Sequence, residues 1–264
     1  MKSVSMQISP ENQVVSVNGI QLYYQVCGEG TPLVLLHNFT SSGQFWQPYL
    51  ADLAKYYRLI IPDMRGHGHS TNPTNQFTHR QSALDIFALL DHLQINQFKA
   101  LGASSGGMTL IHMATQQPER VEAMVLIGAT IYFTEQARAI MKEWTVESEI
   151  WDWELLRQQH LYGDDQIRAL LTQFHNFKDS YDDMNFTTPY LSTITAKTLI
   201  VHGDRDSFFP VSIPVEMYTS IPHAYLWIVP NGDHIPIFDN YATEFTQTTL
   251  EFLAREWDLT TSSP

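Results

Sequence analysis

The chain has 264 residues, 44% of them hydrophobic, enough to build the core of one large α/β domain or of one domain with an insertion. Its 15 lysines and arginines stand against 28 aspartates and glutamates, so the formal charge is -13. Such a charge repels nucleic acid and anionic membrane surfaces, and we expect neither as a partner.

The cysteine content and the N-terminus indicate a compartment. Cys27 is the one cysteine, which excludes an intrachain disulfide and suits a reducing environment. The opening residues, MKSVSMQISPENQ, lack the apolar run of a secretory signal. No stretch approaches the ~18 apolar residues that a membrane span needs. We therefore expect a cytoplasmic protein; the sequence carries no indication of its oligomeric state.

The first predicted element is a β-hairpin. Residues 14–17 and 20–26 flank Asn18-Gly19, a strong turn signal, and the second of these runs alternates apolar and polar residues. Six short apolar runs follow, at 33–36, 58–62, 98–102, 123–128, 198–203 and 225–230. Unbroken apolar runs are typical of parallel strands covered on both faces. The pattern predicts a mostly parallel sheet of about eight strands, with an antiparallel first pair.

Helical patterns lie between these runs. Residues 82–95 carry apolar side chains at i, i+3, i+4 and i+7, which gives one apolar face. Residues 106–117 are helix-like and end before Pro118, which cannot continue a helix. Repeated alternation of strand and helix predicts an α/β fold with helices flanking the sheet.

Residues 129–192 interrupt this alternation. They contain no strand-like run and are too long for a simple crossover, so we predict a helical cap there. The core domain would then comprise residues 1–128 and 193–264. The segment is rich in aromatic residues, which suggests a lid with an apolar underside: Trp144, Trp151, Trp153, Tyr162, Phe174, Phe177 and Tyr181.

Two adjacent serines in LGASSGGM, residues 101–108, are candidate nucleophiles. Small residues stand two positions before and after each of them, so sterics alone do not choose. The flanks favour Ser104, because the apolar strand then ends at Leu101 and Gly106-Gly107 opens the helix. Ser105 would contribute its backbone N–H, the first of the helix, to an oxyanion hole.

A serine nucleophile needs a base histidine and an orienting acid, each at the carboxyl end of a strand and in the order Ser, acid, His. His234 follows the last predicted strand, and no other histidine fits the base. His223 precedes that strand, at the wrong end of the sheet. Asp204 and Asp206 both follow the strand at 198–203.

The motifs LLHNFTSS, PDMRGHGHS, LGASSGG, VHGDRD and NGDH occur in the order of the α/β-hydrolase family, which the chain resembles along nearly its whole length. The resemblance to small bacterial enol-lactonases and carboxylesterases implies an α/β-hydrolase fold. It makes Asp206 the acid and the Phe39 backbone N–H the second oxyanion donor. The chain has Asn38 where the family usually has glycine. Asn tolerates left-handed backbone angles, so we expect it to keep the loop's conformation, and its side chain to be a candidate substrate contact.

Asp63, His67 and His69 stand close together in the sequence and are candidate metal ligands. By the family resemblance they form a structural loop, and no second cluster offers further ligands. We therefore expect no metal and no cofactor.

These residues predict a serine hydrolase that cleaves a small to medium carboxylic ester or lactone through an acyl-enzyme. Three alternatives keep the same triad: a carbon–carbon bond hydrolase, an acyltransferase and a ligand receptor. The carbon–carbon hydrolase usually needs a cation for a substrate carboxylate, and Arg138, Arg157 and Arg168 are candidates that solvated helix faces explain more simply. The sequence leaves the natural substrate open.

Overall fold

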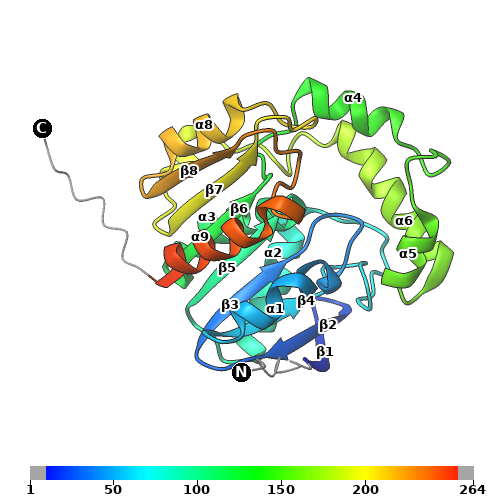
Figure 1. The fold of residues 1–264 in the computed structure, drawn as a ribbon. Coiled ribbons are helices and arrows are strands. Elements are labelled where there is room, and N and C mark those ends of the chain that lie inside the picture. Colours follow the sequence, from blue (N-terminus) through cyan, green and yellow to red (C-terminus); the bar gives the residue numbers. More distant parts are fainter. Residues whose placement is uncertain (1–9, 255–264) are drawn as a thin grey trace, which may run out of the picture.

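A computed structural model describes residues 10–254 and contains one eight-stranded sheet with helices on both faces (Figure 1). The sheet order is β1-β2-β4-β3-β5-β6-β7-β8. β1 pairs antiparallel with β2, β2 pairs antiparallel with β4, and the remaining pairs are parallel. The predicted mostly parallel sheet with an antiparallel first pair is confirmed. The strands are β1 (Glu11–Val17), β2 (Ile20–Cys27), β3 (Thr31–Leu36), β4 (Tyr57–Pro62), β5 (Phe98–Ala103), β6 (Val121–Ile127), β7 (Lys197–Gly203) and β8 (Ala224–Val229).

Nine α-helices and four short 3-10 helices connect the strands of the described chain. The α-helices are α1 (Gln47–Leu53), α2 (His79–His92), α3 (Ser105–Gln116), α4 (Glu135–Glu143), α5 (Trp153–Gln159), α6 (Gly163–Asn176), α7 (Thr188–Leu191), α8 (Ser212–Ser220) and α9 (Ala242–Ala254). The 3-10 helices are η1 (Gly43–Trp46), η2 (Pro118–Arg120), η3 (Phe177–Asp179) and η4 (Asp239–Tyr241).

The sheet separates two hydrophobic layers, because successive side chains of a strand point to opposite faces. In β3, Val34 and Leu36 pack in one layer with residues of α2, α3 and α8. Leu33 and Leu35 pack in the other layer with residues of α1 and α9. Both faces are therefore covered, which explains the unbroken apolar runs of the central strands.

The boundaries of local elements follow from turn and cap chemistry. Asn18 and Gly19 both have positive φ, 44° and 78°, as the predicted two-residue hairpin turn requires. α2 begins at His79, three residues before the predicted helix. Its start is set by Thr78, whose hydroxyl accepts a hydrogen bond from the Gln81 backbone N–H.

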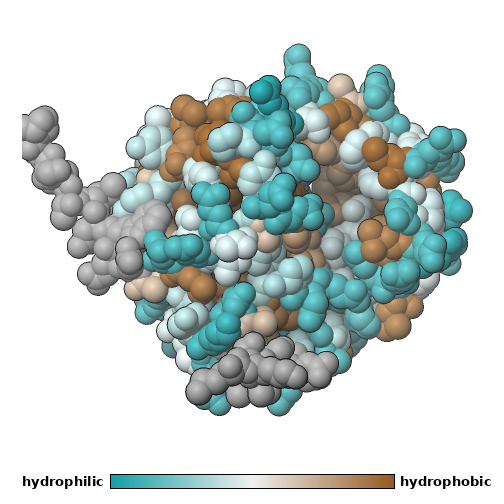
Figure 2. Space-filling view, in the orientation of Figure 1, coloured by the Kyte–Doolittle hydropathy of each residue, from teal (hydrophilic) through white to brown (hydrophobic). Residues whose placement is uncertain are grey.

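Residues 129–192 lie between β6 and β7 and contain α4, α5, α6, η3 and α7. We call these residues the helical segment. Their β pairing within the described chain is one isolated bridge, Tyr132 with Asn185. Figure 1 shows α4, α5 and α6 arching along one side of the sheet. Figure 2 shows hydrophobic residues among polar ones on that side. Ile150, Leu155 and Leu161 are among the exposed apolar side chains of this segment.

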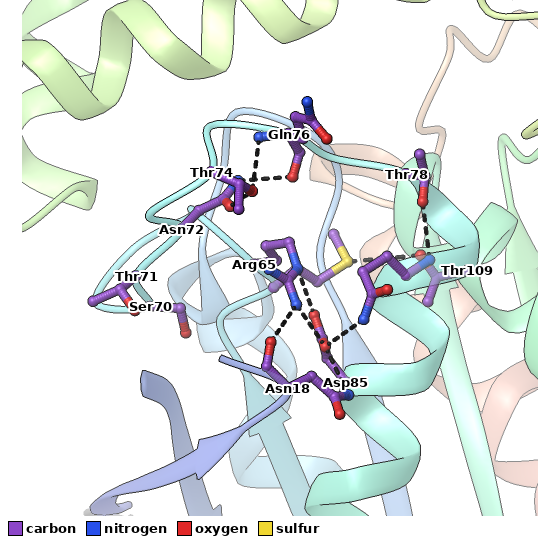
Figure 3. A network of polar contacts seen from close by, with 12 residues as sticks. Asn18, Arg65, Ser70, Thr71, Asn72, Thr74, Gln76, Thr78, Asp85 and Thr109 are labelled. Atoms are coloured by element: carbon purple, nitrogen blue, oxygen red, sulfur yellow. Dashed lines mark hydrogen bonds and ion pairs between the residues drawn. The ribbon is translucent and has the colours of Figure 1, made fainter. Parts of the chain in front are cut away.

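A buried ion pair anchors the loop that follows β4. Arg65 donates two hydrogen bonds of 2.8 Å to the Asp85 carboxylate, from Nε and from one terminal nitrogen. Asn18 and Gln81 donate to the same carboxylate, at 3.0 and 3.1 Å (Figure 3). The Arg65 and Asp85 side chains are 6% and 0% exposed. The network ties the hairpin turn and the loop to α2.

Two further features bear on the expectations above. Cys27 is buried at the end of β2, and burial raises the pKa of its thiol. Within residues 10–254, no helix combines the length and the hydrophobicity that crossing a bilayer requires.

Candidate active site

Ser104 occupies a tight turn between β5 and α3. Its backbone has φ 49° and ψ -113°, a conformation that a residue with a side chain rarely adopts. The turn packs closely against the end of β3, since a Cβ placed on Gly106 would lie 2.3 Å from the Leu36 carbonyl oxygen. Such a strained strand–turn–helix is the context that makes the pentapeptide around Ser104 informative.

The structure brings His234 and Asp206 to Ser104. His234 lies in the loop after β8, and its Nε2 is 3.0 Å from the Ser104 Oγ. Its Nδ1 is 2.8 Å from Oδ2 of Asp206, which follows β7. Asp204, the other candidate acid, has no hydrogen bond to His234 among those of the described chain, and its Oδ1 is buried without a hydrogen-bond partner, 3.8 Å from Arg205 Nε.

The Asp206 carboxylate is buried yet held ionised. Burial works to raise its pKa, but the hydrogen bond and charge of His234 and the Phe209 backbone N–H outweigh burial, so the pKa lies below its usual range. Its Oδ1 accepts from the backbone N–H groups of Phe208 and Phe209, at 2.7 and 3.1 Å. An ionised carboxylate only accepts, so Nδ1 of His234 carries the proton and Nε2 is free to accept from Ser104.

One contact that positions His234 was not predicted from the sequence. Gly128, directly after β6, has φ 55°, and a Cβ there would lie 2.2 Å from the His234 carbonyl oxygen. Only glycine allows this approach. The glycine that ends the run at 123–128 was the available signal.

The two residues proposed to form an oxyanion hole both line one cavity with Ser104 and His234. Among residues 10–254, no backbone acceptor takes a hydrogen bond from the Phe39 or the Ser105 N–H outside regular helix and strand pairing. Both N–H groups thus remain available to a ligand.

The expectation for the Asn38 backbone is wrong. The left-handed backbone of this loop falls at Thr40, with φ 64°, and not at Asn38. The Asn38 side chain instead donates from Nδ2 to the Phe39 carbonyl oxygen at 3.1 Å, and its Oδ1 is buried without a partner. Asn38 also lines the cavity, as expected for a candidate substrate contact.

The cavity has a volume of about 140 Å³ and is mostly aromatic. Four predicted aromatics of the helical segment reach it. Six further apolar residues join them, two from the same segment and four from elsewhere in the chain. The full lining is Asn38, Phe39, Thr40, Ser104, Ser105, Met108, Phe133, Met141, Trp144, Trp151, Phe174, Phe177, Phe208, Phe209 and His234. The pair Phe208-Phe209, two residues after Asp206, was a signal that sequence reasoning missed.

Three predicted aromatics lie outside the cavity. Tyr181 is 64% exposed and stacks on Arg138. Tyr162 is also exposed, and its hydroxyl donates to the His69 carbonyl oxygen at 3.2 Å. The Trp153 ring lies beneath the guanidinium of Arg157. These residues shape the outer side of the segment.

The arginines considered for a substrate carboxylate are engaged elsewhere. Arg138 donates to the carbonyl oxygens of Lys178 and Ser180, at 2.6 and 2.8 Å, and so ties the helical segment together. Arg157 pairs with Asp164 on the surface. Arg168 lies over the Trp153 ring. The cavity lining in the described chain includes no arginine or lysine.

The residues weighed as metal ligands have other contacts. Asp63 accepts from the Gly43 and His69 backbone N–H groups at 2.7 and 2.8 Å, and its Oδ2 is 3.3 Å from His69 Nδ1. The fully buried His67 ring is near the Phe39 ring, and burial holds its pKa well below the usual value. No three His, Cys, Asp or Glu side chains of residues 10–254 are grouped to hold a metal ion.

Comparisons with known proteins place the chain among hydrolases. The model of the alpha/beta hydrolase fold family matches residues 31–147. The human serine hydrolase BPHL is 30% identical over 254 residues, covering 90% of this chain and 85% of its own. A 2-hydroxy-6-oxo-6-(2'-aminophenyl)hexa-2,4-dienoic acid hydrolase of Metapseudomonas resinovorans is 22% identical, covering 93% and 92%. The solved enol-lactonase of Burkholderia xenovorans LB400 superposes with a TM-score of 0.73 at 24% identity, covering 92% of this chain and all of that one.

Proposed function

This chain belongs to the α/β-hydrolase family, and from that premise we propose that it is a serine hydrolase of small carboxylic esters or lactones. One observation carries the proposal: Ser104, His234 and Asp206 form a continuous hydrogen-bonded chain beside an apolar cavity. That order of groups is the arrangement by which a serine hydroxyl becomes a nucleophile.

The reaction proceeds in two acyl-transfer steps. His234 takes the Ser104 proton as Oγ attacks the carbonyl carbon, and the oxygen of the tetrahedral intermediate is bound by the Phe39 and Ser105 N–H groups. His234 then protonates the leaving alkoxide, and the carbon–oxygen bond to it breaks. Water, deprotonated by the same histidine, attacks the acyl carbon. The bond from that carbon to Ser104 Oγ then breaks as His234 returns the proton to Oγ, and the acid is released. For a lactone, the alkoxide remains part of the released hydroxy acid.

The cavity supports a small, uncharged and largely apolar substrate. Its volume of about 140 Å³ lies below the roughly 300–1,000 Å³ typical of ligand pockets. Its walls are mostly aromatic, and five of its eight phenylalanine and tryptophan side chains come from the helical segment, which we propose to act as a cap over the site. The cap would exclude water while the acyl-enzyme forms.

Carbon–carbon bond hydrolysis is the second candidate, supported by the similarity to the Metapseudomonas resinovorans enzyme. A substrate of that kind carries a carboxylate, and the cavity lining in the described residues offers it no arginine or lysine. Arg138 is occupied by backbone carbonyl groups of the helical segment. The ester or lactone is therefore favoured.

The experiment uses short-chain p-nitrophenyl esters and unsubstituted lactones of increasing ring size. We expect turnover by the wild type, loss of turnover in Ser104→Ala, and fluorophosphonate labelling that maps to Ser104. Absence of both turnover and labelling would leave a ligand receptor as the better description. Ester products formed from added alcohols would indicate acyl transfer. Cleavage of a carbon–carbon substrate but of no ester would support the second candidate.

A further inference from the structure

Each of the two oxyanion donors is linked to the helical segment by hydrogen bonds through buried side chains. We propose that these links make the helical segment a positioning element of the oxyanion hole: His160 holds the Phe39 side through Thr40, and Asp183 holds Ser105 through His79. The inference rests on the proposed function. It adds three positioning residues, His160, Asp183 and His79, to the triad.

The first link runs from His160 to the loop that carries Phe39. The Gly68 N–H donates to His160 Nδ1 at 2.9 Å, so Nδ1 carries no proton. The proton is therefore on Nε2, which donates to the Thr40 carbonyl oxygen at 3.1 Å. The His160 side chain is buried, and burial lowers its pKa, in keeping with a neutral ring. His160 thus bridges two loops of the core from within the helical segment.

Thr40 needs such support because its backbone is strained. It is β-branched and has φ 64°, where branched side chains are rare. Phe39 is the residue directly before it, so the direction of the Phe39 N–H depends on this conformation. The Phe39 ring also packs against Phe177 of the helical segment, with centroids 4.9 Å apart. Releasing His160 would leave the strained residue without its carbonyl partner.

The second link is a Ser-His-Asp chain parallel to the proposed triad. His79 Nε2 is 3.1 Å from the Ser105 Oγ, and His79 Nδ1 is 2.6 Å from Oδ2 of Asp183. Asp183 also accepts from the His79 and Arg80 backbone N–H groups, at 2.8 and 3.1 Å. It therefore caps the start of α2, where the helix dipole favours a negative charge. His79, Ser105 and Asp183 are 0%, 3% and 8% exposed.

The charge of Asp183 fixes the direction of this chain. Burial works to raise its pKa, but the charge and hydrogen bonds of His79 and the two N–H groups hold it below the usual range. The ionised carboxylate accepts from Nδ1–H of His79, and Nε2 of the same ring lies at hydrogen-bonding distance from the Ser105 hydroxyl. A nearby histidine of α3, His112, is fixed to the Asp183 carbonyl oxygen at 2.7 Å.

This second chain does not make Ser105 a second nucleophile. A base must also return its proton to the leaving group, so it has to reach the substrate cavity. His234 lines that cavity and its side chain is 21% exposed. His79 is fully buried and is not part of the cavity lining. The role left for the chain is to hold Ser105, whose N–H is the oxyanion donor, at a fixed place.

The core residues at which the two links end are themselves joined by a buried ion pair. The Arg65–Asp85 pair joins the loop that carries Gly68 to α2, which carries His79 (Figure 3). A displacement of the helical segment would therefore be felt at both oxyanion donors.

The test compares His160→Leu and His79→Leu with a control, Gln166→Ala, using a p-nitrophenyl ester. Gln166 donates to the Gly66 and Gly68 carbonyl oxygens at 2.9 and 3.0 Å. It thus joins the helical segment to the same loop without touching Thr40 or Ser105. We expect each leucine variant to lower kcat about 10- to 100-fold with KM changed less than about threefold. We expect Gln166→Ala to stay within about twofold in kcat.

Affinity for a tetrahedral adduct separates positioning from loss of stability. We expect the Ki of phenylboronic acid, whose adduct with a serine mimics the transition state, to rise by the same factor as kcat/KM falls. His160→Gln and His79→Gln, which can donate and accept at once, should recover most of the activity. Adding Ser105→Ala to His79→Leu should lower kcat no further than the stronger single variant.

Two results separate the failures. If wild type is active, Ser104→Ala is inactive and the leucine variants keep kcat within twofold while melting at a lower temperature, the inference is overturned and the proposed function stands. If Ser104→Ala retains wild-type turnover, the proposed function fails and the inference with it.

Discussion

The buried pair of Arg65 and Asp85 allows a direct test of how burial sets the strength of an ion pair. In Asp85→Ala, the Arg65 guanidinium loses both of its 2.8 Å bonds and stays charged, because arginine does not deprotonate in proteins. Asn18 and Gln81 lose their acceptor as well. An uncompensated buried charge of this kind typically destabilises by about 3–5 kcal/mol.

The chain contains a matched control on its surface. Arg157 donates to Asp164 from two nitrogens at 2.8 and 2.9 Å, the same two-pronged geometry, but the side chains are 54% and 47% exposed. Solvent screens this pair, so Asp164→Ala should lower the free energy of unfolding far less than Asp85→Ala does. Geometry is nearly constant between the two pairs, and exposure is the variable.

The assay is urea unfolding followed by far-ultraviolet circular dichroism, with the free energy of unfolding extrapolated to water. A double variant, Arg65→Met with Asp85→Leu, should recover most of the stability lost in Asp85→Ala, since no charge is then left buried. Equal losses for Asp85→Ala and Asp164→Ala would refute the reasoning, and so would a double variant less stable than the single one.

Three other predictions follow from the site and its surroundings. Ser104→Ala should lower kcat on the order of 10⁴-fold, and Ser105→Ala far less because its N–H remains; the reverse ranking in ester hydrolysis would falsify the assignment. Gly106→Ala should lower the yield of folded protein or its melting temperature by several degrees, since the new Cβ meets the Leu36 carbonyl oxygen at 2.3 Å; an unchanged melting curve contradicts this. Burial lowers the pKa of His37 and of His112 to about 4, so the unfolded chain binds protons there first as pH falls below ~6.5. Each should then remove about 2 kcal/mol of stability between pH 7.5 and pH 5, and a urea midpoint that is flat over this window would exclude the effect.

The sequence was sufficient for the sheet and for the central residues of the site because their signals are local. The central strands are short apolar runs. Ser104 follows β5 directly, and Asp206 and His234 lie in the loops that follow β7 and β8. An apolar run in the sequence shows where a strand ends and which residues follow it. Such runs place side chains at the same edge of the sheet without any knowledge of packing.

The contacts of the helical segment were not predictable in the same way. His160 meets Thr40 across 120 residues, and Asp183 meets His79 across 104. No spacing rule joins such pairs, because the path of the segment over the core decides them. The start of α2, in contrast, could have been predicted from the sequence. Thr78 and Gln81 form a capping-box pattern, which places the helix start at His79. The prediction for the Asn38 backbone failed because Thr40, two residues later, has the left-handed conformation of this loop.

Cys27 has a practical consequence for watching this molecule move. The whole sequence holds no other thiol, and burial keeps this one protonated and shielded from reagents. A cysteine introduced at an exposed position of the helical segment, such as Tyr181, would therefore be the single fast-reacting site for a fluorophore or a spin label. Because Cys27 is shielded, a label on one added cysteine reports whether the segment moves, and no native cysteine has to be removed first.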